Sequence, residues 1–129
     1  MEFVVRTRLG TFAPNADVIV DEEQRRVVAV VEVAGADPQT LRIEFDGRGL
    51  TIAGRRLEAV PFRHGSFAQK EIAHGEFLKR IALPLPVEAE GITASYGDGY
   101  LVVVAPIAAT AYTSTARTEM HVIVKRIRP

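Results

Sequence analysis

The chain has no cysteine among its 129 residues, and it has no long apolar run. The absence of cysteine excludes disulfide bonds, thiolate zinc sites and cysteine nucleophiles. No apolar run approaches the roughly 18 residues that a membrane-spanning helix needs. The first ten residues carry two arginines without an apolar core, unlike a secretory signal. We therefore expect a cytoplasmic protein that has no contact with membranes.

An excess of charge of either sign is also missing. The 16 lysines and arginines balance the 16 aspartates and glutamates, so the formal net charge is zero. A neutral chain creates no long-range field toward nucleic acid or an anionic membrane, so neither partner is expected. Weak repulsion between copies favours self-association.

Amphipathic helices are not evident in the sequence, whereas the patterns typical of strands are frequent. Short β-branched or alternating segments lie at residues 27–33, 41–46, 50–53, 77–83, 92–96 and 100–104. Glycines and prolines separate them, and the Gly-Asp-Gly sequence at 97–99 is typical of a tight hairpin turn. Several short strands with turns between them predict an all-β sandwich.

Three segments lie outside this strand pattern. Residues 1–13 form a short N-terminal arm, and residues 56–70 form a connection that is too long for an ordinary hairpin loop. Residues 107–129 form a tether of small residues and a tail, with an apolar patch at 122–124 and a basic end. The predicted organisation is the arm, a sandwich domain at 14–106, and the tether with its tail.

Catalytic and cofactor motifs are not convincing in this chain. His64, His74 and His121 lack the short spacing of a metal-ligand pair. The sequence has neither a Gly-x-Ser-x-Gly elbow nor a phosphate-binding Gly-Lys-Ser/Thr motif. The acids at 21–23 are typical of a solvated turn, and the basic end is too small for a nucleic-acid site. We expect no enzyme, no metal and no cofactor.

An ordered set of motifs resembles the small heat-shock protein family. In chain order the motifs are Asp17-Val18-Ile19-Val20-Asp21-Glu22, Val33-Ala34-Gly35, Leu50 through Arg56, Glu71 with Gly75-Glu76-Phe77-Leu78-Lys79, Leu83-Pro84, and Ala94 through Leu101. They correspond to the family's Asp-Val-x-Val-x-Glu opening, Gly-centred loop, Leu-Thr-Ile-x-Gly-x-Arg strand, Gly-x-Phe-x-Arg strand, Leu-Pro and Ala-x-x-x-(Asn/Asp)-Gly-x-Leu hairpin. Each motif is weak alone, but their order over about residues 14–106 is specific. One departure is Lys79, which stands where the family usually has arginine. The resemblance implies an α-crystallin domain, which is an immunoglobulin-like antiparallel β-sandwich.

The resemblance also gives the tail a role. The family's tail often carries an (Ile/Val)-x-(Ile/Val) motif, and here Val122 and Val124 match it. Its implied role is docking into a groove on a neighbouring domain, where two apolar side chains on one face of an extended peptide fill two pockets. The implied groove residues are Leu41, Ile43, Ile92 and Ala94. Residues 122–124 could also be an ordinary last strand of the same domain.

Two further segments receive roles from the family. The long connection is expected to carry a strand that pairs with a partner subunit's sheet and makes a dimer. The candidate strand is Ser66, Phe67, Ala68, Gln69 and Lys70. The arm is expected to contact client proteins through Phe3, Val4, Val5 and Phe12.

The function implied by the resemblance is that of a holdase chaperone, which binds partly unfolded proteins without ATP and prevents their aggregation. The expected partners are the chain itself, as a homodimer or higher oligomer, and unfolded clients. Alternatives are a co-chaperone-like sandwich module, a small hydrolase, and a structural assembly protein that captures no clients.

Overall fold

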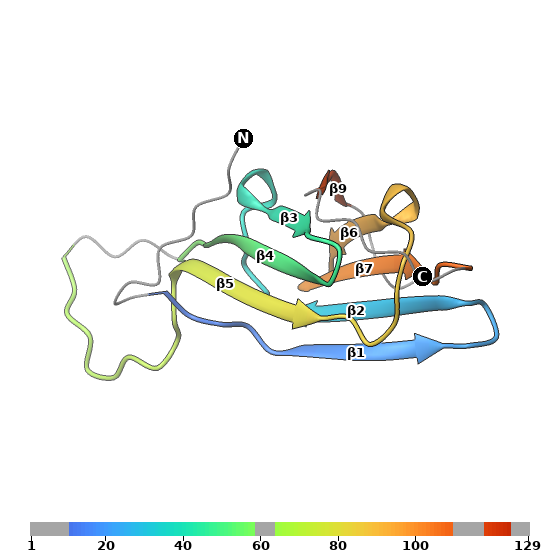
Figure 1. The fold of residues 1–129 in the computed structure, drawn as a ribbon. Helices are drawn as coiled ribbons and strands as arrows, with labels where there is room; N and C mark the ends of the chain where they lie inside the picture. Colours follow the sequence, from blue (N-terminus) through green and yellow to red (C-terminus); the bar gives the residue numbers. More distant parts are fainter. Residues whose placement is uncertain (1–10, 59–63, 110–117, 125–129) are drawn as a thin grey trace.

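Two β-sheets packed face to face make up the fold in the computed structural model, which describes residues 11–58, 64–109 and 118–124 (Figure 1). The strands are β1 (Ala16–Asp21), β2 (Arg26–Glu32), β3 (Arg42–Phe45), β4 (Gly49–Arg56), β5 (Gly75–Ala82), β6 (Thr93–Gly97), β7 (Tyr100–Pro106), β8 (Thr118–Met120) and β9 (Val122–Val124). One sheet has the order β1-β2-β7-β6-β9, and the other has the order β5-β4-β3-β8. The described residues contain no α-helix, only the 3-10 turns η1 (Pro38–Thr40) and η2 (Ala89–Gly91). The predicted all-β sandwich is confirmed.

Local sequence explains where the strands run and turn. The run at 27–33 forms most of β2, which pairs antiparallel with β7 along its whole length. At the β6–β7 turn, Asp98 and Gly99 have φ values of 53° and 83°. Two successive residues with positive φ fit the primed hairpin turn that the Gly-Asp-Gly sequence predicts.

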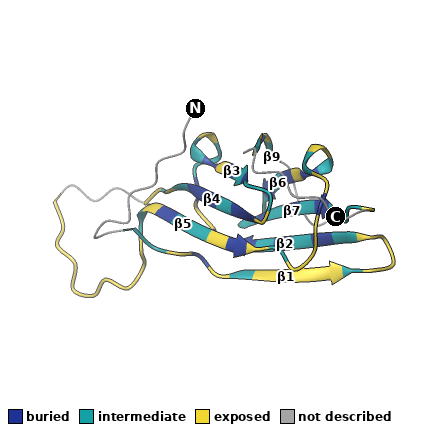
Figure 2. Ribbon diagram, in the orientation of Figure 1, coloured by how far each residue is buried: buried dark blue, intermediate teal, exposed yellow. Residues whose placement is uncertain are grey.

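The core lies between the sheets and is formed by every second residue of the central strands (Figure 2). Ile43, Ile52 and Phe77 from one sheet, and Val31 and Leu101 from the other, are almost completely buried. This is the pattern that alternating strands give when one face of each sheet is covered.

A buried tyrosine fixes the loop between β2 and η1. The Tyr96 hydroxyl donates to the Val33 carbonyl at 2.9 Å and accepts from the Ala36 amide at 3.2 Å. Because all three residues are buried, these bonds satisfy polar groups that water does not reach. The loop that follows β2 is therefore held against β6.

None of the helical segments in the described ranges is long and apolar enough to cross a membrane.

Candidate functional site

The four predicted groove residues come together in the structure. Leu41 immediately precedes β3, Ile43 lies in it, Ile92 immediately precedes β6, and Ala94 lies in β6. All four are buried and belong to one apolar cluster, although the two strands belong to different sheets. The groove is thus the side of the sandwich where one sheet ends beyond β3 and the other ends beyond β6.

The tail lies across both of these sheet edges. β8 pairs antiparallel with β3, with Met120 opposite Ile43. β9 pairs parallel with β6, with Val122 opposite Ala94. The chain crosses from one sheet to the other at His121, between the two strands. The tail therefore extends both sheets by one short strand each, and β9 lies beside β6 in Figure 1.

The two tail side chains that approach the core are Met120 and Val122. Met120 is 9% exposed, and Val122 is partly buried against the core cluster. Ile123 and Val124 are each 59% exposed. A hollow of about 350 Å³ remains between η2, β6 and the tail, lined by Met120 and Ile92 among others.

The predicted dimer-exchange strand lies on a loop that projects from the sandwich (Figure 1). Ser66 to Lys70 are all exposed and have no strand assignment within this single chain. Phe67 is 66% exposed, and the Lys70 ammonium lies 5.2 Å from the centroid of its ring. Ile72, further along, is 63% exposed. The loop therefore presents two large apolar side chains to solvent.

Arg56 joins the base of this loop to two other segments. Its guanidinium donates to the Ala34 carbonyl at 2.9 Å and to the Ala73 carbonyl at 3.0 Å. It also lies 4.6 Å from the centroid of the Phe12 ring. One side chain thus contacts three segments: the loop after β2, the end of the long loop just before β5, and the first described residues.

Of the predicted arm residues, Phe3, Val4 and Val5 lie outside the described residues, whereas Phe12 is packed against β5. The Phe12 amide donates to the Glu76 carbonyl at 3.2 Å, and its carbonyl accepts from the Leu78 amide at 2.9 Å. The Phe12 and Phe77 ring centroids are 5.6 Å apart. The Phe12 ring is partly buried as a result.

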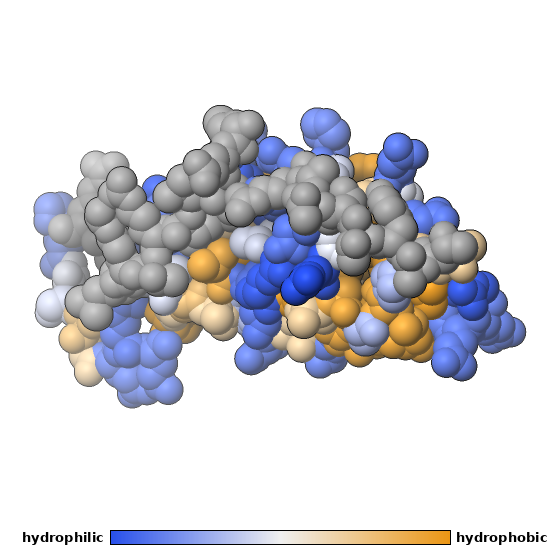
Figure 3. Space-filling view, viewed as in Figure 1, coloured by the Kyte–Doolittle hydropathy of each residue, from blue (hydrophilic) through white to orange (hydrophobic). Residues whose placement is uncertain are grey.

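The edge strand β1 exposes apolar side chains. β2 is its strand partner among the described residues, so its other edge has unpaired backbone groups. Val18, Ile19 and Val20 are all exposed, and Figure 2 shows most of β1 in the colour of exposed residues. Figure 3 shows hydrophobic surface over the same part of the molecule, where β1, β2 and β5 lie in Figure 1.

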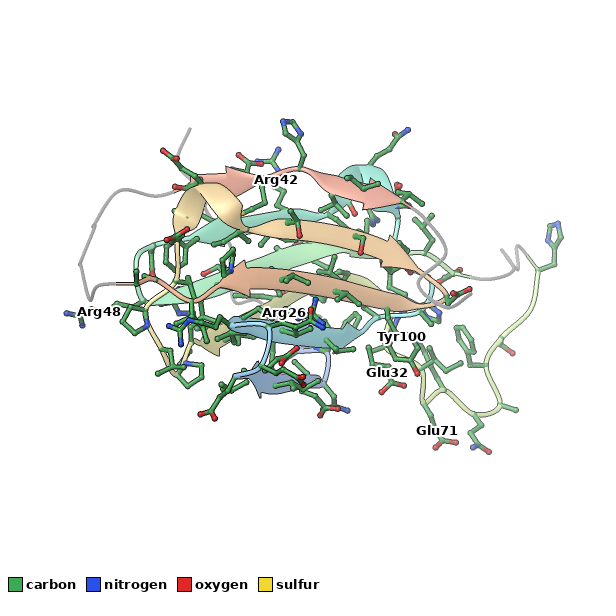
Figure 4. The ribbon with its side chains drawn as sticks, turned by 90° about the vertical axis from the view of Figure 1, so that its right-hand side faces the viewer. Arg26, Glu32, Arg42, Arg48, Glu71 and Tyr100 are labelled. Atoms are coloured by element: carbon green, nitrogen blue, oxygen red, sulfur yellow. The ribbon has the colours of Figure 1, made fainter. Side chains whose placement is uncertain are left out.

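The outer face of the five-stranded sheet is also apolar at its centre. Val28 lies opposite Val104, and Val30 lies opposite Val102. All four are half-buried, because the residues that alternate with them fill the core. Figure 4 faces this surface and shows Arg26 toward one end of β2, with Glu32 and Tyr100 together toward the other.

An ion pair joins β5 to the turn before β4. Arg80 Nη2 lies 2.7 Å from Asp46 Oδ2. Partial burial raises the pKa of Asp46, but the amides of Arg48 and Gly49 and the Arg80 guanidinium together lower that pKa below its ordinary value. Arg80 follows Lys79, the position where the resembling family usually has arginine.

The described residues contain no group of three or more His, Cys, Asp or Glu side chains that could hold a metal ion. His64 and His121 are exposed. His74 is partly buried, and its Nδ1 has no hydrogen-bond partner.

Sequence reasoning missed three features of this region. Met120 lies outside the apolar patch that the sequence indicates at 122–124, although Met-x-Val at 120–122 alternates in the same way as Val-x-Val. The apolar outer face had a signal in residues 27–31 and 101–105, where valine occupies both alternate sets of positions. The role of Arg56 had no signal, because it depends on three segments that only the fold brings together.

Comparison with known proteins agrees with this architecture. The family model described as "Hsp20/alpha crystallin family" matches residues 3–122. The small heat shock protein C4 of Rickettsia felis is 28% identical over 94 residues, which are 73% of this chain and 56% of that protein.

Two solved structures are similar over most of their length. Heat shock protein 16.0 from Schizosaccharomyces pombe has a TM-score of 0.69 at 24% identity, covering 87% of this chain and 84% of that one. A small heat-shock protein from Xylella fastidiosa has a TM-score of 0.64 at 30% identity, covering 81% and 94%.

Proposed function

Because the chain belongs to the Hsp20/alpha crystallin family of small heat-shock proteins, which are chaperones, we propose that it is an ATP-independent holdase. It binds partly unfolded proteins on apolar surface and keeps them from aggregating. It performs no covalent chemistry on them.

The observation that carries this proposal is the buried groove beneath a short tail. Ile43 and Ala94 are almost completely buried, and the strands that lie beside them, β8 and β9, have three residues each. Strands of this length make few backbone hydrogen bonds, so opening requires less free energy than opening a central strand. Opening exposes two unpaired sheet edges and an apolar floor, which bind an extended apolar segment by strand addition.

The tail also docks on a neighbouring copy. Val122 and Val124 lie on one side of β9, and a long tether precedes them, so the tail reaches either its own groove or that of a bound neighbour. Tethering gives a high effective concentration for both routes. When a tail leaves its own groove to dock on a neighbouring copy, it uncovers that groove, so assembly and groove opening are coupled.

The dimer forms when the projecting loop of one copy adds to the sheet of another. The segment from Ser66 to Lys70 is exposed and has no strand partner in this single chain, and β1 presents an open edge with exposed Val18 and Val20. Burying Phe67 and the β1 valines in one interface removes both apolar surfaces from water. The similar Xylella protein is described as having a distinct high order structure, which supports self-association here.

Client capture uses further apolar surface besides the groove. The arm residues Phe3, Val4, Val5 and Phe12 supply apolar side chains, and the valines on the outer face of the five-stranded sheet supply an apolar patch. Partly unfolded proteins present apolar segments of matching chemistry.

The experiment is a light-scattering assay of a heat-unfolded enzyme without nucleotide, run beside native mass measurement. Val122→Asp places a charge against the core and is expected to change both native mass and client protection. Ile123→Asp, on the adjacent exposed position, is the matched control and is expected to leave both within error.

Each outcome discriminates between functions. If the unaltered chain never slows aggregation at a several-fold molar excess, the holdase proposal is wrong. Oligomers without protection would instead indicate a structural assembly protein. Protection that is identical in Val122→Asp and the unaltered chain would remove the groove from the mechanism.

A further inference from the structure

The tail anchor contains the one sulfur atom of the chain outside its first residue. The sequence has no cysteine and two methionines, Met1 and Met120. Met120 lies in β8 opposite Ile43 and is 9% exposed. It also lines the hollow of about 350 Å³ that Ile92 and Ala94 border.

We propose that Met120 is an oxidation site, and that a peroxide acting on its thioether releases the tail from the groove. The sulfur attacks one peroxide oxygen and the O–O bond breaks. The sulfur gains an S–O bond and loses two electrons, while hydrogen peroxide is reduced to water. This inference rests on the proposed role of the tail as a reversible cover of the groove.

The geometry gives the oxidant access. The hollow is much larger than the roughly 30 Å³ that one water molecule occupies in the liquid, and hydrogen peroxide is only slightly larger than water. Its lining includes the polar residues Thr118 and His121, which keep part of the wall wettable. A thioether on the wall of such a hollow is reached without unfolding the sandwich.

Oxidation reverses the chemistry of the anchor. The product, methionine sulfoxide, is polar and carries a hydrogen-bond acceptor that the thioether lacks. Met120 is buried in the apolar cluster that includes Ile43, so on that side the docked sulfoxide finds no hydrogen-bond donor, and it is fully hydrated only when the tail is open. Val122 is then the remaining apolar side chain of the tail packed against the core, besides the backbone pairing of β8 and β9, and the equilibrium shifts toward the open groove.

The tail's other contacts make this shift large. β8 has three residues, and of these Met120 is the buried one. Ile123 and Val124 contribute little, since each is mostly exposed. We expect amide hydrogen exchange across residues 118–124 to become roughly 10- to 100-fold faster after oxidation, the factor that one unsatisfied buried polar group gives.

The test uses the full chain, treated with hydrogen peroxide and then analysed by peptide mass and by hydrogen exchange. Peptide mass locates the added oxygen and separates Met120 from Met1. Met120→Leu is the matched control, because it keeps the volume and polarity of the anchor but cannot be oxidised. Met120→Gln imitates the polar product without oxidant.

Expected results are faster exchange at 118–124 in the oxidised chain and in Met120→Gln, no change in treated Met120→Leu, and recovery after a methionine sulfoxide reductase acts. The proposal is wrong if folded chain resists oxidation at Met120, or if the oxidised tail exchanges as slowly as before. It is also wrong if treated Met120→Leu loses protection equally. Because exchange at the tail is read without any client, failure of the holdase proposal appears separately in light scattering.

Discussion

Substitution of Gly54 tests whether core packing fixes the position of Phe12 as well as the stability of the sandwich. A Cβ built on Gly54 would lie 2.6 Å from Phe77 Cζ and 3.0 Å from Leu41 Cδ2. Both neighbours are buried, and Phe77 is only 1% exposed, so neither can turn toward solvent. Residue 54 in the Leu50–Arg56 motif is therefore glycine because no side-chain atom fits there, and Gly54→Ala forces the Phe77 ring to move.

The size of the effect follows from overpacking. Inserting one methyl group into a filled core costs about 1–3 kcal/mol. For a domain of about 100 residues, each kcal/mol lowers the melting temperature by about 4–8 °C. Gly54→Ala is therefore expected to lower it by roughly 4–24 °C. The displaced Phe77 ring also loses its packing against Phe12, so the amide of Phe12 should exchange faster.

The assay is thermal and urea unfolding of Gly54→Ala, Phe77→Leu and the double variant. Leucine lacks the ring atoms that meet the new methyl group. The double variant should therefore lose less unfolding free energy than the two single variants lose together. The coupling should exceed about 0.5 kcal/mol, the usual limit of additivity for independent sites. Strictly additive losses, or a Gly54→Ala variant as stable as the unaltered chain, would refute the reasoning.

Three further predictions concern contacts around the site. Tyr96→Phe removes both hydroxyl bonds and leaves the Ala36 amide with its 3.3 Å bond to the Val33 carbonyl, so it should cost about 0.5–1.5 kcal/mol per bond lost in urea unfolding; no loss would show that the hydroxyl does not hold this loop. Arg56→Lys cannot donate to two carbonyls in the same fork geometry, so hydrogen exchange should quicken at the loop base while native secondary structure by circular dichroism is unchanged. The pKa of Asp46 is lowered in the folded chain, so its stabilisation is present above the ordinary aspartate pKa of about 3.9 and is lost as pH falls below it. The difference in melting temperature between the unaltered chain and Asp46→Asn should thus be positive at pH 7 and vanish near pH 2; a constant difference would contradict the ion pair with Arg80.

The fold was predictable because each strand carries its own pattern. Leu41, Ile43 and Phe45 alternate with polar residues, and all three are buried. The Gly-Asp-Gly sequence specified a turn with positive φ at two residues, as Asp98 and Gly99 show. These are local signals, so the sequence is sufficient to detect them.

The anchors of the projecting loop were not predictable in the same way. Arg56 contacts Ala34 and Ala73, which are 22 and 17 residues away along the chain. An arginine near the end of a strand usually points to solvent, and nothing in its neighbours indicates a partner. Long-range polar contacts of this kind follow from the topology, which places the loop after β2, the base of the long loop and the first described residues at one end of the sandwich.

The tail illustrates how a correct pattern leaves a choice of register. Positions 120, 122 and 124 all face one way in an extended chain, so alternation predicts the face but not which pair of side chains meets the core. The choice is made where the chain crosses from β3 to β6, at His121. Met120 and Val122 flank the crossing and lie over the core between the two sheets. Val124 lies further along β9, beside β6. In the proposed docking on a neighbouring copy, Val122 and Val124 are the two anchors, so the tail would cross between the sheet edges two residues later, at Ile123. The two modes of docking then differ in the residue at the crossing, and Met120→Asp should weaken docking within one chain while leaving the proposed docking between chains intact.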